Sequence, residues 1–305
     1  MNLHHLRVFL AVAECGGIGA GAARLHISQP AVTREIRELE ASVGVPLFDR
    51  HPRGVSLTEG GRRLLQYAQR IFALELAAER ELRGFASLSQ GELHLGASAT
   101  LGSYLLPPLL NRFREQYPQV FVSLQISNTG EVTQQLDDGR IALGFVEGAF
   151  DRAGYAHRLL ARDALLPVVG PRHPLAGRRD LTMRELAEHA LYLREPGSGA
   201  RASVEEAYRE HGLEPQARMV IGGTEALKRL IADGHGIAWL SQLVVGEELA
   251  CGRLQRLQVR DRQIVRELHV LWRQDSQLSP APAAFLALLE AAAASATEAP
   301  RQPGG

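Results

Sequence analysis

The feature that most constrains the fold is the stretch 17–58, which predicts two short helices joined by a tight connection. The second helix is expected to begin at Ser28, a residue type that caps helix N-termini well. Pro30 then falls in the first turn, where its missing N–H has no intrahelical partner. The helix has one apolar stripe at helical spacing: Val32, Ile36, Leu39 and Val43.

The polar side of this second helix carries residues suited to nucleic acid. Thr33, Arg34 and Arg37 fall off the apolar stripe and are expected to face outward. A shorter helix at 20–25 precedes it. Two short helices with a tight connection, the second opening with polar residues and arginine, have the geometry that places side chains in a DNA major groove.

Residues 45–57 follow as two short extended runs around a Pro/Gly turn, a pattern typical of a wing beside such a helix pair. Arg50 and Arg53 lie near the expected tip, where guanidinium groups would contact phosphates. The whole chain has a formal net charge of zero, which by itself argues weakly against a nucleic-acid binder. The prediction therefore rests on the motif, whose local arginines make it modestly basic.

Three consecutive motifs in this region resemble the winged helix-turn-helix of LysR-type transcriptional regulators. They are A-A-R-L-H-x-S-Q-P-A-V-T, then I-R-x-L-E-x-x-x-G-x-x-L-F-x-R, then R-x-x-x-L-T-E-x-G. The residues expected to face DNA bases are Ser28, Gln29, Pro30, Thr33 and Arg34. Those expected to hold the DNA backbone are Arg37, Arg50 and Arg53.

The chain departs from the family pattern where it leads into the first motif helix. The family usually has Gly-Ser-Phe-Thr and alanines there, whereas this chain has glycine at 16, 17, 19 and 21. Each glycine inside a helix costs about 0.5–1 kcal/mol relative to alanine. Glu35 stands where the family often has Gln, and its carboxylate is mildly repulsive toward DNA. These departures predict weaker operator binding, or a stronger dependence on an effector. They do not imply loss of DNA binding, because the second helix itself keeps the family pattern.

A long helix is predicted for 59–88, capped by Thr58, without an internal stop signal. Such length favours pairing with a second copy, and the resemblance implies a linker helix in an antiparallel dimer. A dimer would present two DNA-reading helices, one from each winged helix-turn-helix, to half-sites about one DNA turn apart. The resemblance therefore implies double-stranded promoter DNA as partner of a homodimer or homotetramer, with RNA polymerase as a further candidate partner.

From residue 91 the chain alternates apolar strands and helices, which predicts an α/β fold with a parallel sheet covered on both faces. The expected elements include one helix at 101–116 and a strand that begins at residue 164. We expect two lobes, crossed twice by the chain: lobe I at 91–162 and 267–296, and lobe II at 163–266. They resemble the family's effector domain, a relative of type 2 periplasmic binding proteins. The expected domains are an all-α winged helix-turn-helix at 1–58, a linker helix at 59–90, the effector domain at 91–296 and a disordered tail at 297–305.

Ligands of open α/β sheets bind at the carboxyl ends of strands, near helix N-termini, where hydroxyls and free N–H groups favour a small anion. The candidate effector-binding residues are Ser98, Thr100, Asn128, Thr129, Ser198, Arg201 and Thr224. Several of these residues could instead be simple helix N-caps. Ala200 stands where the family often has Thr. Residues 96–107 and 144–148 are similar to a subgroup that includes regulators of sulfur assimilation and carbon fixation, which implies sulfite-like or phosphorylated anions.

The competing interpretations are an enzyme, or a solute-binding module, with an incidental helix-turn-helix. The glycines at 17–21 lack a preceding strand and G-x-G-x-x-G spacing, and no G-x-S-x-G elbow appears. No histidine pair has metal-ligand spacing with a third ligand nearby, and His4 and His5 are expected to face solvent. We therefore expect no catalytic residues, no metal and no cofactor.

Export is not expected either. The apolar segment 6–15 fits one face of a helix, and Glu14 is unsuited to a cleavage site. No apolar run approaches the roughly 20 residues needed to span a membrane. Cys15 and Cys251 are the only cysteines and lie far apart, which fits a reduced cytosol. We expect a cytoplasmic protein with no membrane partner.

Overall fold

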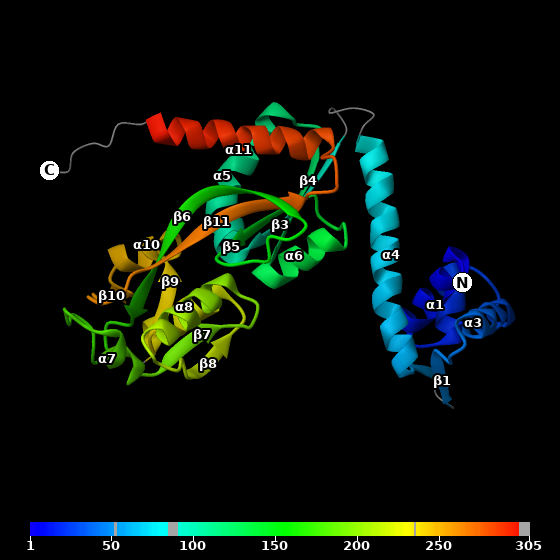
Figure 1. Cartoon of the computed structure of the whole chain (residues 1–305), viewed down its shortest axis with the longest axis horizontal. Coiled ribbons are helices and arrows are strands. Elements are labelled where there is room, and N and C mark those ends of the chain that lie inside the picture. The colour runs from blue at the N-terminus through cyan, green and yellow to red at the C-terminus, as the bar shows by residue number, and fades with distance from the viewer. Residues whose placement is uncertain (52–53, 85–90, 235, 299–305) are drawn as a thin grey trace. The chain divides into compact units, whose positions relative to one another are not determined.

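The computed structural model describes residues 1–51, 54–84, 91–234 and 236–298. Its contacts divide the chain into two compact units, Met1–Glu79 and Arg80–Gly305. Figure 1 shows the elements of each unit. None of the described helices combines the length and the apolar character needed to cross a membrane.

The first unit contains the predicted helix pair and wing. Its elements are α1 (Leu3–Cys15), α2 (Ile18–Leu25), α3 (Gln29–Val43), β1 (Phe48–His51), β2 (Gly54–Leu57) and most of α4 (Glu59–Gly84). Ser28 caps α3 as predicted, because its Oγ accepts a hydrogen bond from the Ala31 N–H at 3.4 Å. β1 and β2 pair antiparallel, with Phe48 opposite Leu57.

The core of this unit forms where α1 and α3 face each other. Its fully buried side chains include Leu6, Phe9, Val12, Val32, Ile36 and Leu39. The apolar stripe predicted for α3 is therefore its buried face, and the opposite face is left for solvent or a partner. Thr58 caps α4 by accepting a hydrogen bond from the Gly61 N–H at 3.0 Å. α4 is described to Gly84, and the predicted end of this helix lies outside the described residues.

One glycine of α2 is required by packing. A Cβ on Gly21 would lie 2.9 Å from Val12 Cγ2 and 3.0 Å from Val12 Cα, so α1 and α2 approach too closely for a side chain there. A Cβ on Gly19 would meet only the Gln29 side chain, whose Nε2 lies 2.9 Å away and can move. Packing therefore requires glycine at position 21 but not at position 19, a difference that the sequence alone does not reveal.

Gly21→Ala is expected to lower the free energy of unfolding of the first unit by about 1–3 kcal/mol, because the added methyl overpacks the α1–α2 contact. Gly19→Ala, the matched control, should be neutral or stabilise by up to about 1 kcal/mol, since alanine favours the helix. Urea unfolding followed by circular dichroism measures both. Equal effects of the two substitutions would show that the close approach of α1 and α2 is not a constraint.

The second unit is built on a seven-stranded sheet with the order β10-β6-β11-β5-β3-β4, and β9 pairs with β6. β3 (Glu92–Ser98), β4 (Phe121–Ser127) and β5 (Leu143–Glu147) run parallel. The long strands β6 (Tyr155–Val169) and β11 (Ile264–Arg273) run antiparallel to each other and continue from one lobe into the other (Figure 1). The parallel arrangement expected for the strands of 92–146 is confirmed by β3, β4 and β5, whereas the sheet as a whole is mixed because β6 and β11 run antiparallel.

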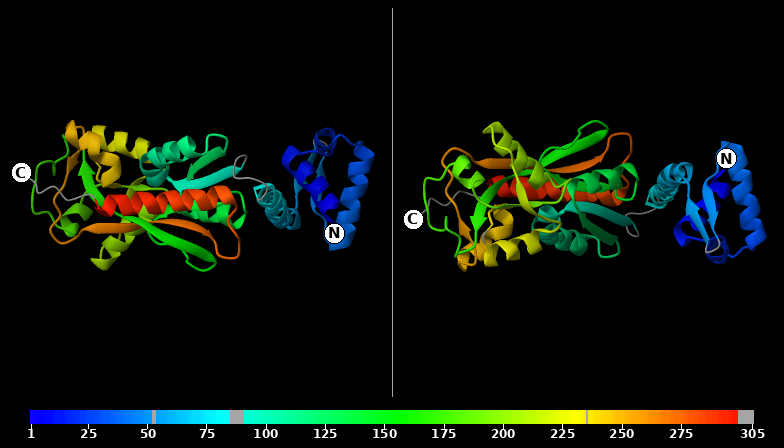
Figure 2. Two further views of the ribbon diagram at one scale, coloured as in Figure 1. Left: turned by 90° about the horizontal axis from the view of Figure 1, so that it is seen from above. Right: turned by 90° about the horizontal axis from the view of Figure 1, so that it is seen from below.

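Helices cover both faces of the lobe I part of this sheet. α5 (Leu106–Gln116) and α11 (Pro280–Glu298) pack on one face around Phe113, Phe145 and Phe285. Both views of Figure 2 show α11, in red, running alongside the sheet. α6 (Thr129–Asp137) packs on the other face through Val132 and Leu136. A π-helix, η2 (Leu101–Leu105), precedes α5 where a single helix was predicted.

Lobe II has its own core, centred on Tyr208 and Trp239. Its other elements are α7 (Met183–Ala187), β7 (Leu191–Arg194), α8 (Gly199–Glu210), β8 (Ala217–Ile221), α9 (Thr224–Asp233), β9 (Ala238–Ser241), α10 (Gln242–Ala250) and β10 (Gln255–Arg256). β7 and β8 form a separate parallel pair.

Three expectations about element boundaries need correction. β6 begins at Tyr155, well before the predicted start at 164, because its first half is partly exposed and carries no continuous apolar run. α10 was not predicted at all. Residues 297 and 298 belong to α11 rather than to a disordered tail, and the rest of that tail, 299–305, lies outside the described residues.

Candidate nucleic-acid interface and effector cleft

The polar side of α3 forms a surface hollow of about 540 Å³ at its N-terminal half. The hollow is lined by Gln29, Pro30, Thr33, Arg34, Arg37 and Glu38. Ser28 is exposed immediately before them as the helix cap. Six of the eight predicted DNA-contact residues therefore lie on one exposed surface. Arg50 lies in β1 opposite Val55, but its side chain, and all of Arg53, fall outside the described residues.

Arg34 is held by neighbouring carboxylates on its own helix. Its Nη2 donates to Glu35 Oε1 at 3.1 Å, and its Nε lies 3.8 Å from Glu38 Oε1. The Arg34 side chain is 68% exposed, and exposed ion pairs of this kind contribute only about 0–1 kcal/mol. Arg34 can therefore leave these carboxylates for a stronger acceptor, such as a guanine edge or a phosphate.

The second unit holds a buried charge cluster that the sequence analysis missed. The Arg266 side chain is 1% exposed, and its Nη1 lies 2.8 Å from Glu147 Oε1. Its Nε donates to Asp163 Oδ2 at 2.9 Å, and its Nη2 donates to Thr100 Oγ1 at 3.1 Å. Ser241 Oγ donates to the other Asp163 oxygen at 2.8 Å. The cluster ties β5, β6, β11 and the segment after β3 together.

A sequence signal for this cluster did exist. Glu147 ends the apolar run 141–146, Asp163 directly precedes the apolar run 164–169, and Arg266 directly follows the apolar pair 264–265. Charged residues are almost never fully buried unless they are paired, so three such interruptions indicate a shared buried site. Their partners could not be identified from spacing, because the three residues come from three different strands.

The two lobes meet where α6 and β5 face the start of α8. The Gly130 N–H donates to Gly197 O at 3.2 Å. A Cβ on Gly199 would lie 1.8 Å from Glu147 O, so the backbones touch at this point. A cavity of about 680 Å³ opens beside this contact, and Thr129, Ser198 and Arg201 are among its lining residues.

The predicted effector residues fall into different environments. Ser198 and Thr129 are buried, and Thr129 Oγ1 donates to Glu147 O at 3.3 Å. Arg201 donates from Nε to Glu205 at 2.7 Å and from Nη1 to Arg194 O at 3.1 Å. Asn128 caps α6 in a reciprocal arrangement with Glu131.

Thr224 is not a helix N-cap, which was one alternative for the candidate effector-binding residues. Gly223 is the N-cap of α9, and Thr224 Oγ1 instead accepts a short hydrogen bond from Nη1 of the buried Arg194. Its hydroxyl is therefore engaged inside lobe II. Thr100 is engaged in the same way by Arg266. Neither residue is among those lining the 680 Å³ cavity.

Three of the buried polar atoms without a hydrogen-bond partner in the described part of the chain belong to this region: Ser98 Oγ, Glu147 Oε2 and Arg266 Nη1. Arg266 Nη1 nevertheless lies within ion-pair distance of Glu147 Oε1. An unsatisfied buried polar group costs roughly 1–3 kcal/mol. Ser98 and Glu147 are not among the residues that line the 680 Å³ cavity. Glu147 Oε2 is an acceptor and would favour a ligand that also carries a donor.

His5 lies in an environment different from the predicted one. Its side chain is 15% exposed and sits between the carboxylates of Glu35 and Glu38, so the expectation that it faces solvent is wrong. His4, at 66% exposed, does face solvent.

Two family models match the chain. "Bacterial regulatory helix-turn-helix protein, lysR family" matches residues 3–62, and "LysR substrate binding domain" matches residues 86–294. The first covers the helix pair and wing, and the second covers the two-lobed unit.

Curated relatives and solved structures agree with these matches. The HTH-type transcriptional activator CmpR of Synechocystis sp. is 30% identical over 285 residues, which is 93% of each chain. A structure of full-length CbnR complexed with its target DNA has a TM-score of 0.71 at 26% identity, covering 95% of this chain and 99% of CbnR. The CcmR regulatory domain of Synechocystis in complex with 2-PG has a TM-score of 0.62 at 30% identity, covering 67% of this chain and 98% of that domain.

Proposed function

The chain belongs to the LysR family and is an effector-responsive, DNA-binding transcriptional regulator, and we propose here which residues read DNA and which bind the effector. The observation that carries the proposal is the exposed polar face of α3, backed by an apolar stripe that packs into the core. We propose that the protein acts in the cytoplasm by binding alone, without catalysis.

Ser28, Gln29, Pro30, Thr33 and Arg34 are proposed to face the bases, because recognition helices contact base edges with their N-terminal residues. Arg37, Arg50 and Arg53 are proposed to hold phosphates. A guanidinium can contact O6 and N7 of guanine together, and this makes Arg34 the main candidate for sequence discrimination. The DNA complex of the related CbnR supports binding to duplex DNA. We propose a homodimer or homotetramer, whose two-fold symmetry would match paired half-sites, with RNA polymerase as a neighbour on the promoter.

The effector is proposed to be a small anion bound between the lobes. The N-terminal residues of α6 and α8, among them Thr129 and Ser198, line the cavity there, and helix N-termini attract negative charge. Arg201 also lines this cavity, together with Asp137, Asp151 and Glu205. Its Nε donates to Glu205 Oε1 at 2.7 Å, so a bound anion would have to compete with that carboxylate for Arg201. The 2-PG complex of a related regulatory domain supports a small ligand at this domain.

The remaining candidate residues are given supporting roles. Ser98 does not line the cavity, and its unsatisfied hydroxyl is proposed to contact the effector only after a local rearrangement. Thr100 and Thr224 would position the buried Arg266 and Arg194, and Asn128 would hold the first turn of α6. Closure of the lobes on the effector would change how the dimers are arranged. It would therefore change the spacing between the α3 helices that contact DNA.

Mobility shift of the chain's own upstream intergenic DNA, across a salt series, tests the DNA half of this proposal. Arg34→Ala should lose about 1–3 kcal/mol of discrimination between the operator and scrambled DNA. Arg37→Ala should weaken binding to both DNAs alike and reduce the salt slope by about one. Arg140→Ala, an exposed arginine of the second unit, serves as the control and should leave both affinities unchanged.

Unchanged operator affinity in both α3 variants would overturn the proposal that the polar face of α3 contacts DNA.

The same assay with sulfite, phosphate and small phosphate esters tests the effector half. A specific shift that none of these anions alters would count against an anionic effector while leaving DNA binding intact.

A further inference from the structure

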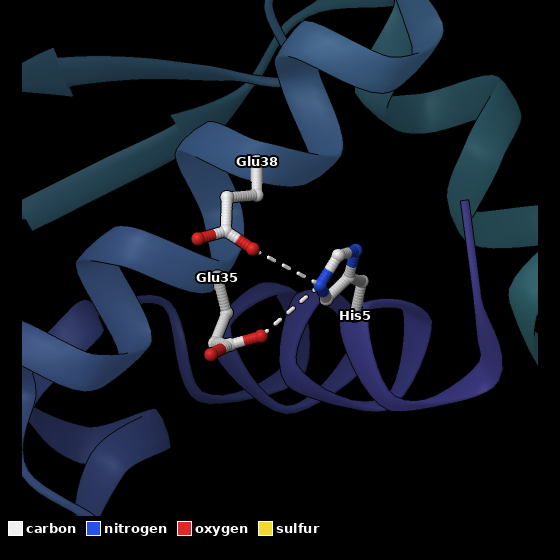
Figure 3. A group of neighbouring side chains, drawn as sticks. All are labelled: His5, Glu35 and Glu38. Atoms are coloured by element: carbon white, nitrogen blue, oxygen red, sulfur yellow. Dashed lines mark ion pairs between the residues drawn. The ribbon is translucent and has the colours of Figure 1, made fainter.

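A histidine of α1 and two glutamates of α3 converge on one point of the first unit. His5 Nε2 lies 3.2 Å from Glu35 Oε2 and 3.4 Å from Glu38 Oε2. One ligand atom from each residue lies within 4.8 Å of the other two. Figure 3 shows the imidazole directed at both carboxylates from across the α1–α3 packing.

A single linear hydrogen bond from His5 accounts for only one of these two contacts. Nε2 carries at most one proton and can satisfy only one of two carboxylate oxygens at nearly equal distance. A tetrahedral Zn²⁺ with N and O ligands at about 2.0–2.2 Å separates neighbouring ligand atoms by roughly 3.3–3.5 Å. The observed separations of 3.2 and 3.4 Å therefore match two edges of such a tetrahedron.

Arg34 orients the two carboxylates. It approaches Glu35 and Glu38 through their Oε1 atoms, at 3.1 and 3.8 Å, and leaves the Oε2 atoms directed at His5. Outer partners help to orient metal ligands, and Arg34 makes one hydrogen bond of this kind, to Glu35, within an exposed and therefore weak ion pair. The side chains of His5 and Glu35 are only 15% and 12% exposed, so two of the three ligands are held in place by packing.

We propose that His5, Glu35 and Glu38 bind a divalent transition metal of the zinc class, with water completing the tetrahedron. Imidazole selects Zn²⁺ and its neighbours over Mg²⁺ and Ca²⁺, which prefer oxygen alone. His5 Nδ1 is buried and has no partner among the described residues. Because a missing outer partner lowers metal affinity about 10–100-fold, the site should be weaker than a structural zinc site.

The consequence for DNA binding rests on the proposed function of α3. Glu35 and Glu38 place two negative charges beside Arg34 on the surface proposed to meet DNA. A bound dication neutralises both carboxylates and weakens their hold on Arg34. The metal should therefore strengthen DNA binding, and occupancy of this site would set the affinity of the regulator for its operator.

Metal binding is tested first, without DNA, on the tag-free full-length chain stripped with EDTA. Isothermal titration with Zn²⁺ should show one site that His5→Ala and Glu38→Gln each weaken at least tenfold. Co²⁺ should give the visible absorption of a tetrahedral complex, and Zn²⁺, but not Mg²⁺, should abolish it. His4→Ala removes an exposed imidazole whose Nε2 lies 3.7 Å from Glu35 Oε2, but it removes none of the three ligand atoms. It should leave the affinity within about threefold.

Equal Zn²⁺ binding by wild type and His5→Ala would overturn the site, as would loss of binding in His4→Ala alone. Unchanged circular dichroism of the variants checks that they fold. Because the readout is direct metal binding, failure of the DNA-binding proposal does not affect this result.

The link to DNA is tested by mobility shift with and without Zn²⁺. Wild type should bind its operator roughly fivefold more tightly with the metal, a modest gain expected from neutralising charge beside phosphates. Metal-free Glu35→Gln/Glu38→Gln should already bind like the metal-loaded wild type and should not respond to Zn²⁺. A zinc response in that double variant would overturn the link. Zinc binding by a protein that shifts no DNA would support the metal site and overturn the proposed function.

Discussion

Arg266→Met is expected to lower the free energy of unfolding of the second unit by about 3–5 kcal/mol, because it leaves two buried carboxylates without their cation. Glu147 and Asp163 are 2% and 1% exposed and cannot recover solvation in the folded state. Methionine keeps most of the side-chain volume, so the loss reports charge rather than a cavity. Urea unfolding followed by tryptophan fluorescence measures it, since both tryptophans, Trp239 and Trp272, lie in this unit.

Arg162→Met provides the matched control. Arg162 lies on β6, close in sequence to Asp163, but its side chain is 70% exposed and its nearest Glu267 oxygen is 3.5 Å away. Exposed ion pairs contribute little, so this substitution should change stability by less than about 1 kcal/mol. Similar losses in the two variants would show that the buried cluster does not depend on charge pairing.

Gly199→Ala is expected to destabilise the second unit by about 3 kcal/mol, near the upper end of the range for overpacking. The new methyl would lie 1.8 Å from Glu147 O and 2.8 Å from Glu147 C, and backbone atoms cannot rotate away. The lobes must separate at this point to admit it. We therefore also expect a larger radius of gyration of the second unit, measurable by small-angle X-ray scattering on residues 91–298 if that fragment folds, and otherwise by faster hydrogen exchange at β5 and α8 in the full chain.

Gly246→Ala shows what the same substitution does without a clash. Gly246 is an exposed residue within α10, and a Cβ there would meet nothing within 4 Å. Alanine should stabilise the helix by about 0.5–1 kcal/mol. The two variants should thus change stability in opposite directions. Destabilisation of equal size in both would mean that the contact between Gly199 and Glu147 does not limit closure of the lobes.

The Arg266 cluster and the Gly199 contact meet at one residue. Glu147 offers its side chain to Arg266 and its backbone oxygen to Thr129, and that same oxygen faces Gly199. The end of β5 therefore links the buried charges, the first turn of α6 and the start of α8. A shift of Glu147 would therefore disturb all three of these contacts.

The sequence by itself determined the first unit almost completely. Ser28 and Pro30 define the start of α3 through local hydrogen bonding and a fixed φ, and these effects need no distant contacts. The stripe of Val32, Ile36 and Leu39 defines its buried face through the helical period. The ordered motifs of 22–61 then identified the family, which the family models confirmed.

The sequence was less reliable wherever strands do not form apolar runs. β6 was predicted only in its second half, because the first half is partly exposed and pairs with β11 alone. The parallel sheet was inferred from alternating strands and helices, but that alternation does not reveal that β6 and β11 run antiparallel between the lobes.

Only the tertiary structure decided which charged groups meet. Arg266 reaches Glu147 because β11 lies beside β5, and it reaches Asp163 because β11 also lies beside β6. His5 reaches Glu35 and Glu38 because α1 packs on α3, and Gly21 and Gly199 are needed because two backbones approach there. These contacts depend on strand order, register and helix packing. Such relations join residues far apart in the chain, so no local pattern in the sequence identifies which of these residues meet.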